Sequence, residues 1–96
     1  MSDGDIAGRY LARVERLAAA DPRLTPLAAG ILAAADLGIA ADSTAFCRAL
    51  DVSHALALRE IAALEDLGLL RVTKRDPRTG RTFYARPAPP ASHPPQ

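Results

Sequence analysis

The sequence predicts a mainly α-helical domain of the α+β class, in which four helices precede a small β-hairpin. Two observations support this prediction. Apolar residues recur with the helical period in four segments between residues 5 and 67, and three of these segments begin at a capping residue. From residue 70 onward the pattern changes to alternation around a turn motif, which is typical of two paired strands.

Length and composition fit one small domain, which we expect to be soluble and cytoplasmic. The chain has 96 residues, and only 4% of them are aromatic, so the core must consist mainly of aliphatic side chains. The single cysteine cannot form an intramolecular disulfide, which fits a reducing compartment. The longest apolar run, Leu27 to Ala35, is far shorter than the ~20 residues that span a bilayer, so we expect no membrane association. The proline-rich segment 87–96 is predicted to be disordered.

The first predicted helix covers residues 5–20, and Asp21-Pro22 ends it. Apolar residues recur there at the spacing of one helical face: Ile6, Tyr10, Val14 and Leu17. This stripe can belong to the core or form the interface of a homodimer. Because so small a chain buries little apolar surface, we expect the homodimer interface. Residues 1–23 are therefore interpreted as a packing or dimerisation segment.

The second predicted helix follows a short break. Thr25 caps its N-terminus, and Pro26 occupies the first helical position, where the missing N–H costs nothing. Gly38 ends the helix, and residues 39–41 are compatible with a short extended piece.

The third predicted helix is short, from Thr44 to Leu50, and either Asp42 or Ser43 caps it. Cys47 lies on its inward face, where a buried thiol is expected rather than a redox sensor.

The fourth predicted helix runs from His54 to Leu67 after the tight connection Asp51-Val52. Ser53 caps its N-terminus, and Gly68 is placed to close it in the left-handed conformation.

Residues 70–86 are predicted to form a β-hairpin that carries strong positive charge. Asp76-Pro77 opens its turn, and Gly80 supplies the positive φ that the turn requires. Residues 71–96 contain six basic residues and one acidic residue, a net charge of +5, whereas residues 1–70 contain six against ten, a net charge of −4. This asymmetry indicates an anionic partner, although a solvated basic hairpin explains it equally well. Asp76 is expected to brace the neighbouring arginines.

Two motifs carry a family resemblance. The first is Leu50-Asp51-Val52-Ser53, followed after one helix by Leu64-Glu65-Asp66-Leu67-Gly68-Leu69-Leu70. The second is the hairpin turn, residues 75–81, in which arginines surround an acidic residue. Together with the order of the elements, these motifs resemble the MarR-type transcriptional regulators, whose fold is a winged helix-turn-helix. The resemblance covers residues 24–86.

The resemblance implies that the chain binds double-stranded DNA sequence-specifically as a homodimer and regulates transcription. The fourth helix would enter the major groove, and the basic hairpin would contact the backbone or the minor groove. The N-termini of the third and fourth helices would bind phosphate oxygens. The expected DNA-binding residues are Ser43, Thr44, Ser53, His54, Ala55, Leu56, Arg59, Lys74, Arg75, Arg78 and Arg81.

The fourth helix also supports an alternative function. Residues 54–67 contain one basic and three acidic residues, a net charge of −2, which is unfavourable beside DNA. Leu56 and Leu67 lie about three turns apart on one face of this helix, and we expect that face to be exposed. Leu56 fits a thymine methyl group, but both leucines also fit a protein partner, which would make the chain a protein–protein interaction module.

No pattern in the sequence predicts an enzyme, a metal site or a cofactor. There is no nucleophile–base pairing, no glycine-rich phosphate loop and no metal-ligand spacing, and His54 and His93 cannot be placed in one site. We therefore expect no catalytic residues, no bound metal and no cofactor.

Overall fold

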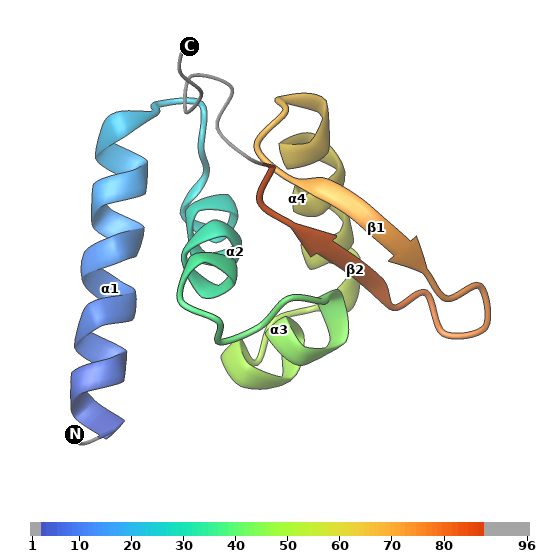
Figure 1. The fold of residues 1–96 in the computed structure, drawn as a ribbon, viewed down its shortest axis with the longest axis horizontal. Helices are drawn as coiled ribbons and strands as arrows, with labels where there is room; N and C mark the ends of the chain where they lie inside the picture. The colour runs from blue at the N-terminus through green and yellow to red at the C-terminus, as the bar shows by residue number, and fades with distance from the viewer. Residues whose placement is uncertain (1–2, 88–96) are drawn as a thin grey trace, which may run out of the picture.

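The computed structural model describes residues 3–87, which form four helices and a two-stranded antiparallel sheet (Figure 1). The elements are α1 (Asp3–Ala20), α2 (Pro26–Asp36), α3 (Ser43–Leu50), α4 (His54–Asp66), β1 (Arg71–Arg75) and β2 (Thr82–Ala85). The predicted α+β class is therefore confirmed. Of the segment predicted to be disordered, only Pro87 lies within the described residues. None of the helices between residues 3 and 87 is long and apolar enough to cross a membrane.

The helix boundaries follow their capping residues. Three N-cap side chains each accept a hydrogen bond from a backbone N–H of the first turn: Thr25 for α2, Asp42 for α3 and Ser53 for α4. Asp42 rather than Ser43 is therefore the cap of α3, and its carboxylate accepts from the Ala45 N–H at 2.8 Å. Gly38 and Gly68 follow the ends of α2 and α4 with φ of 72° and 77°, as the left-handed C-terminal cap requires.

The core is built around α2, which lies between α1 and α4 (Figure 1). Seven consecutive residues of α2, from Ala28 to Ala34, are buried. Ile31 and Leu32 are the largest of them, and they belong to the same cluster as Phe46 of α3 and Ile61 of α4. The small alanine side chains allow neighbouring helices to approach α2 from several sides.

The helix α1 packs along α2 within the same chain. The Tyr10 hydroxyl donates a hydrogen bond to the Gly30 carbonyl at 3.2 Å, and burial raises the pKa of Tyr10. Leu17 packs against the same core. For Tyr10 and Leu17 the structure therefore supports the core rather than the homodimer interface. Val14 is half-buried, and Ile6 is 50% exposed.

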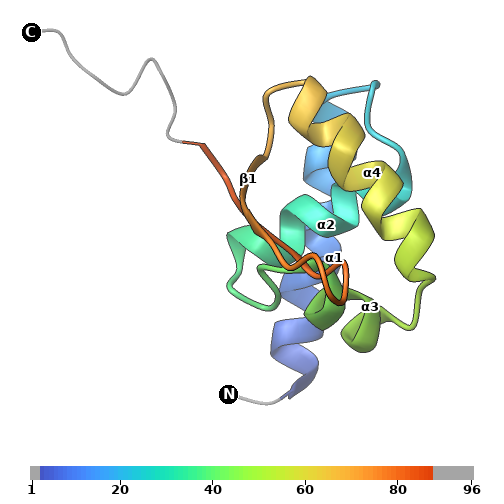
Figure 2. The same ribbon diagram turned by 90° about the vertical axis from the view of Figure 1, so that its right-hand side faces the viewer.

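The strands β1 and β2 form the predicted hairpin, with a bulge between Val72 and Lys74. Gly80 has a φ of 78° in its turn. The expected extended piece before α3 is reduced to one isolated bridge, between Asp42 and Phe83. In Figure 1 the hairpin turn projects beyond the helices, and Figure 2, which views the molecule from that side, shows α1 behind α2.

Candidate nucleic-acid interface

The N-terminal half of α4 presents most of its expected contact residues to solvent. Its inward side consists of Ala57, Ile61 and Leu64, which are buried in the core. The residues exposed around this half of the helix are Ser53, Ala55, Leu56 and Arg59. A flat or convex partner can therefore reach these four side chains without any rearrangement of the core.

The acidic residues of α4 lie away from this exposed half or have partners. Glu60 accepts a hydrogen bond from the Thr25 hydroxyl at 3.0 Å. Glu65 lies 3.5 Å from Arg75 of the hairpin. Asp66 is exposed at the C-terminal end of the helix. The net charge of the helix therefore overstates the negative charge near its N-terminus.

The hairpin cations differ in how firmly they are held. The Arg81 guanidinium donates to both carboxylate oxygens of Asp42, at 3.0 and 3.2 Å. Arg75 makes only the exposed contact with Glu65. Within residues 3–87, no acidic side chain pairs with Lys74 or Arg78. These two residues are therefore the expected contacts on the hairpin that can pair with an anion at no loss of an internal ion pair.

Asp76 was predicted to brace the arginines of the hairpin, and in the structure it forms hydrogen bonds with the backbone of the turn. Its carboxylate accepts a hydrogen bond from the Arg78 N–H at 2.9 Å. Its own N–H donates to the Arg81 carbonyl at 2.9 Å. The Gly80 N–H donates to the Asp76 carbonyl at 2.8 Å. The turn is thus held in one conformation, while the Arg78 side chain extends from it.

A polar junction connects α3, α4 and the hairpin, and we define it as Asp42, Ser43, His54, Arg81 and Thr82. The Ser43 Oγ accepts a hydrogen bond from the Thr82 N–H at 2.9 Å and lies 2.8 Å from Nε2 of His54. Ser43 is fully buried, so the prediction that it contacts phosphate directly is wrong. His54 is half-buried rather than solvent-exposed, because its ring is turned toward Ser43.

The carboxylate of the polar junction is held in its ionised form. Burial raises the pKa of Asp42, but hydrogen bonds from Arg81 and the Ala45 N–H outweigh burial, so that its pKa lies below the usual value. The same contact raises the pKa of Arg81. Arg81 therefore pairs with Asp42 of the same chain, whereas from the sequence we expected it to contact phosphate.

Two further predicted features have intermediate positions. Thr44 is half-buried in the first turn of α3. Cys47 is half-buried rather than fully buried, its Sγ lies 3.8 Å from the Ser53 carbonyl oxygen, and burial raises the pKa of its thiol. A thiol with a raised pKa carries less of the reactive thiolate, so this position favours a packing role.

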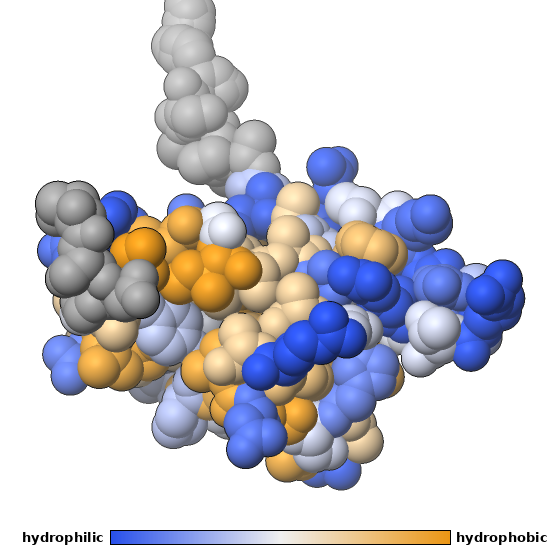
Figure 3. Space-filling view, turned by 90° about the horizontal axis from the view of Figure 1, so that it is seen from below, coloured by the Kyte–Doolittle hydropathy of each residue, from blue (hydrophilic) through white to orange (hydrophobic). Residues whose placement is uncertain are grey.

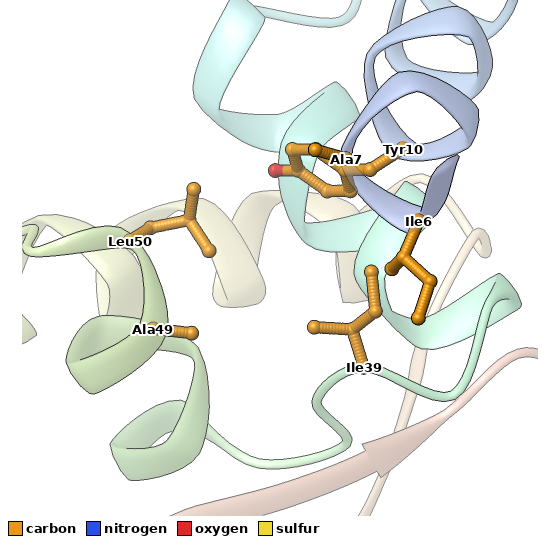
Figure 4. A pocket seen from close by; sticks show the side chains of 6 residues that line it. All are labelled: Ile6, Ala7, Tyr10, Ile39, Ala49 and Leu50. Carbon is orange, nitrogen blue, oxygen red and sulfur yellow. The ribbon is translucent and has the colours of Figure 1, made fainter. Parts of the chain in front are cut away.

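An apolar hollow lies on a different face, between α1 and α3. It has a volume of about 340 Å³, and Ile39 and Leu50 point into it (Figure 4). Its lining residues are Ile6, Ala7, Tyr10, Ile39, Ala49 and Leu50. Figure 3 shows apolar side chains gathered on this lower face, apart from the hydrophilic hairpin. From the sequence, Ile6 and Tyr10 were assigned to a homodimer interface and Leu50 to the end of the third helix. The hollow itself was not predicted, because it is formed by residues of three segments that are separate in the sequence.

The comparisons with known proteins add no family assignment. No family model matches the chain, and no curated protein or solved structure matches it either. The function is therefore argued from the residues and their geometry.

Proposed function

We propose that residues 24–86 are a winged helix-turn-helix domain that binds double-stranded DNA sequence-specifically and regulates transcription as a homodimer. In this proposal α3 and α4 are the helix-turn-helix pair, α4 enters the major groove, and the hairpin is the wing. The family that the sequence resembles, the MarR-type regulators, has the same order of elements.

The observation that carries the proposal is the position of the hairpin turn beside the start of α4. A Cβ atom on Gly80 would lie 3.8 Å from Cε1 of His54, so the turn and the N-terminus of α4 are neighbours. The exposed residues of α4 and the cations Lys74 and Arg78 therefore lie close enough to contact one segment of duplex. Base edges would be contacted from α4, and phosphates from the hairpin.

The homodimer rests on the exposed apolar side chains of α1. Ile6 is 50% exposed and Leu11 is 60% exposed, and Ile6 also lines the apolar hollow. Ile6 and the hollow it lines form a contiguous apolar surface, which fits burial against a second copy. Light scattering of the purified chain at micromolar concentration tests this part, and a monomer at that concentration contradicts it.

A second candidate function is docking of a protein partner through α4. Leu56 is 46% exposed and Leu67 is 36% exposed, although both are large and apolar. In this alternative both leucines are contact residues of equal importance. In the DNA-binding proposal only Leu56 lies in the half of α4 that meets the duplex.

Paired substitutions distinguish the two functions. We expect Leu56→Ala to change the base preference in a selection from random-sequence duplexes, because it removes an apolar contact with a base. We expect Leu67→Lys to leave DNA affinity within about twofold, because it lies about three turns away. The measurement is fluorescence anisotropy with labelled duplex at low salt, with folding checked by circular dichroism. Wild-type protein that fails to bind any duplex, while both variants lose the same protein partner, would support the second function instead.

A further inference from the structure

The polar junction is the place where buried polar groups collect. Among the residues that the structure describes, the buried polar or charged ones are Asp42, Ser43 and Thr82, and all three belong to this junction. A buried polar group destabilises a fold unless its hydrogen bonds are made. A network that satisfies them also favours one arrangement of the elements it joins, since any other arrangement leaves groups unpaired.

A single oxygen atom joins three elements at the junction. The Ser43 Oγ, at the start of α3, accepts the Thr82 N–H of β2. Its second partner is Nε2 of His54, the first residue of α4. An imidazole with its proton on Nδ1 accepts a hydrogen bond from the Ser43 hydroxyl at Nε2. The buried hydroxyl can then donate to His54 and accept from Thr82 at the same time.

The residues on either side of Asp42 reinforce the same connection. The segment 41–43 contacts the hairpin at three successive positions: Ala41 O accepts from Tyr84 N at 3.1 Å, Asp42 pairs with Arg81, and Ser43 accepts from Thr82 N. Of these contacts, only the one at Ser43 continues to α4. Ser43 is therefore the buried hydrogen-bonded link between the hairpin and α4, in addition to the exposed contact of Glu65 with Arg75.

We propose that Ser43 is a positioning residue that fixes the hairpin against the start of α4, so that both contact the same segment of DNA. This inference rests on the proposed DNA binding. Ser43 is buried and touches no DNA itself, so it acts through His54 and Thr82. Without its hydroxyl, the hairpin keeps its fold but loses its fixed position, and Lys74 and Arg78 lose their alignment with the bases that α4 contacts.

The test compares Ser43→Ala with Thr25→Ala. The control is closely matched, because the Thr25 hydroxyl also accepts a backbone N–H and also contacts a side chain of α4, that of Glu60, but makes no contact with the hairpin. Two quantities are measured: amide hydrogen exchange at Thr82 by NMR, and the dependence of DNA affinity on salt concentration.

For Ser43→Ala we expect exchange at Thr82 to rise at least tenfold relative to the amides of α1. We expect DNA affinity to fall about tenfold, and the slope of log K against log salt to decrease in magnitude by about 1 to 2, because fewer phosphates are neutralised together. Thr25→Ala should leave the salt slope unchanged, and it should leave exchange at Thr82 unchanged relative to the amides of α1. A loss of stability alone would not alter the salt slope of the folded protein.

The outcomes separate this inference from the proposed function. Unchanged exchange at Thr82 in folded Ser43→Ala overturns the inference, whatever the chain binds. Wild-type protein that binds no duplex overturns the proposed function, and with it a positioning role on DNA, even if exchange at Thr82 rises. Ser43→Cys, which keeps a side chain of similar size with much weaker hydrogen bonding, gives the same comparison if the alanine variant does not fold.

Discussion

The α1–α2 half of the molecule and the polar junction are held together by different kinds of interaction. In α2, seven consecutive buried residues contain no charged or hydrogen-bonding side chain. At the junction, Asp42, Ser43 and Thr82 are buried. Asp42 accepts hydrogen bonds from Arg81, and Ser43 accepts one from the Thr82 N–H. Apolar packing tolerates many arrangements of similar free energy, whereas a hydrogen-bond network accepts few. We therefore expect most of the free energy of folding to come from packing around α2, and the relative placement of α3, α4 and the hairpin to come from the junction.

The largest effect is expected in the apolar half. Leu32 is 1% exposed at the centre of the core, so Leu32→Ala should lower the free energy of unfolding by about 2–5 kcal/mol through lost burial and the cavity that remains. Urea denaturation followed by circular dichroism measures this quantity. Leu56→Ala, at a residue that is 46% exposed and lies outside the proposed dimer interface, is the matched control and should change it by less than about 1 kcal/mol when no DNA is present. Equal losses from the two variants would mean that α2 is not the centre of the core.

The next effect concerns the charge on the hairpin and leaves stability unchanged. Replacing Lys74 and Arg78 together with alanine should weaken DNA binding more than about tenfold on every sequence at low salt. The slope of log K against log salt should decrease in magnitude by about 1.8 for each bound subunit, because about 0.9 is lost for each phosphate contact. Alanine at Arg9 and Arg16, two exposed residues of α1, provides a control with the same loss of charge. A slope that does not respond to the hairpin pair would exclude the hairpin from the DNA contact.

The smallest effect is a pH dependence at the polar junction. The pKa of Asp42 is lower in the folded protein than in the unfolded chain. Its contribution to stability is therefore present above the unfolded pKa of about 4, and it is lost as the pH falls through the folded pKa. The wild type should be more stable than Asp42→Asn at pH 7, by on the order of 1 kcal/mol, because the amide loses the ion pair with Arg81, and this difference should shrink as the pH falls below the unfolded pKa of Asp42.

Thermal denaturation at several pH values measures this difference. Asp21, whose pKa is lowered to about 2, chiefly by a side-chain hydrogen bond from Arg23, is present in both proteins and cancels in the comparison. Asp66→Asn, at an exposed residue of α4, controls for the change of net charge. A difference that stays constant as the pH falls would show that the charge of Asp42 is not the stabilising feature.

The sequence predicted the elements of the fold well because their signals are local. Thr25, Ser53 and Gly68 mark helix ends through bonds to residues within a few positions, and the structure places each of them as expected. The α4 face that carries Leu56 and Leu67 is also exposed as predicted. Periodicity and caps are properties of short segments, so they can be recognised without knowledge of the tertiary structure.

The polar junction could not be predicted, because its contacts join distant positions. Arg81 meets Asp42 across 39 residues, and Thr82 meets Ser43 across the same separation. From the sequence, Ser43 was a helix-start residue suited to phosphate, and Arg81 was one of several basic residues on a hairpin. Only their burial and mutual distances separate them from Lys74 and Arg78. The contact of Tyr10 with the core could not be predicted for a similar reason, since its partner, Gly30, lies 20 residues away.

The open edge of the hairpin has a consequence for how the protein behaves in concentrated solution. β2 lies between β1 and the bridge at Asp42, whereas β1 has β2 as its one strand neighbour within the described residues. A free strand edge can recruit a strand from another molecule and start a growing sheet. β1 carries Arg71, Lys74 and Arg75 along this edge, and like charges facing each other oppose that pairing. Lys74, which is proposed to face DNA, thus also helps to keep two copies of the hairpin from adding edge to edge.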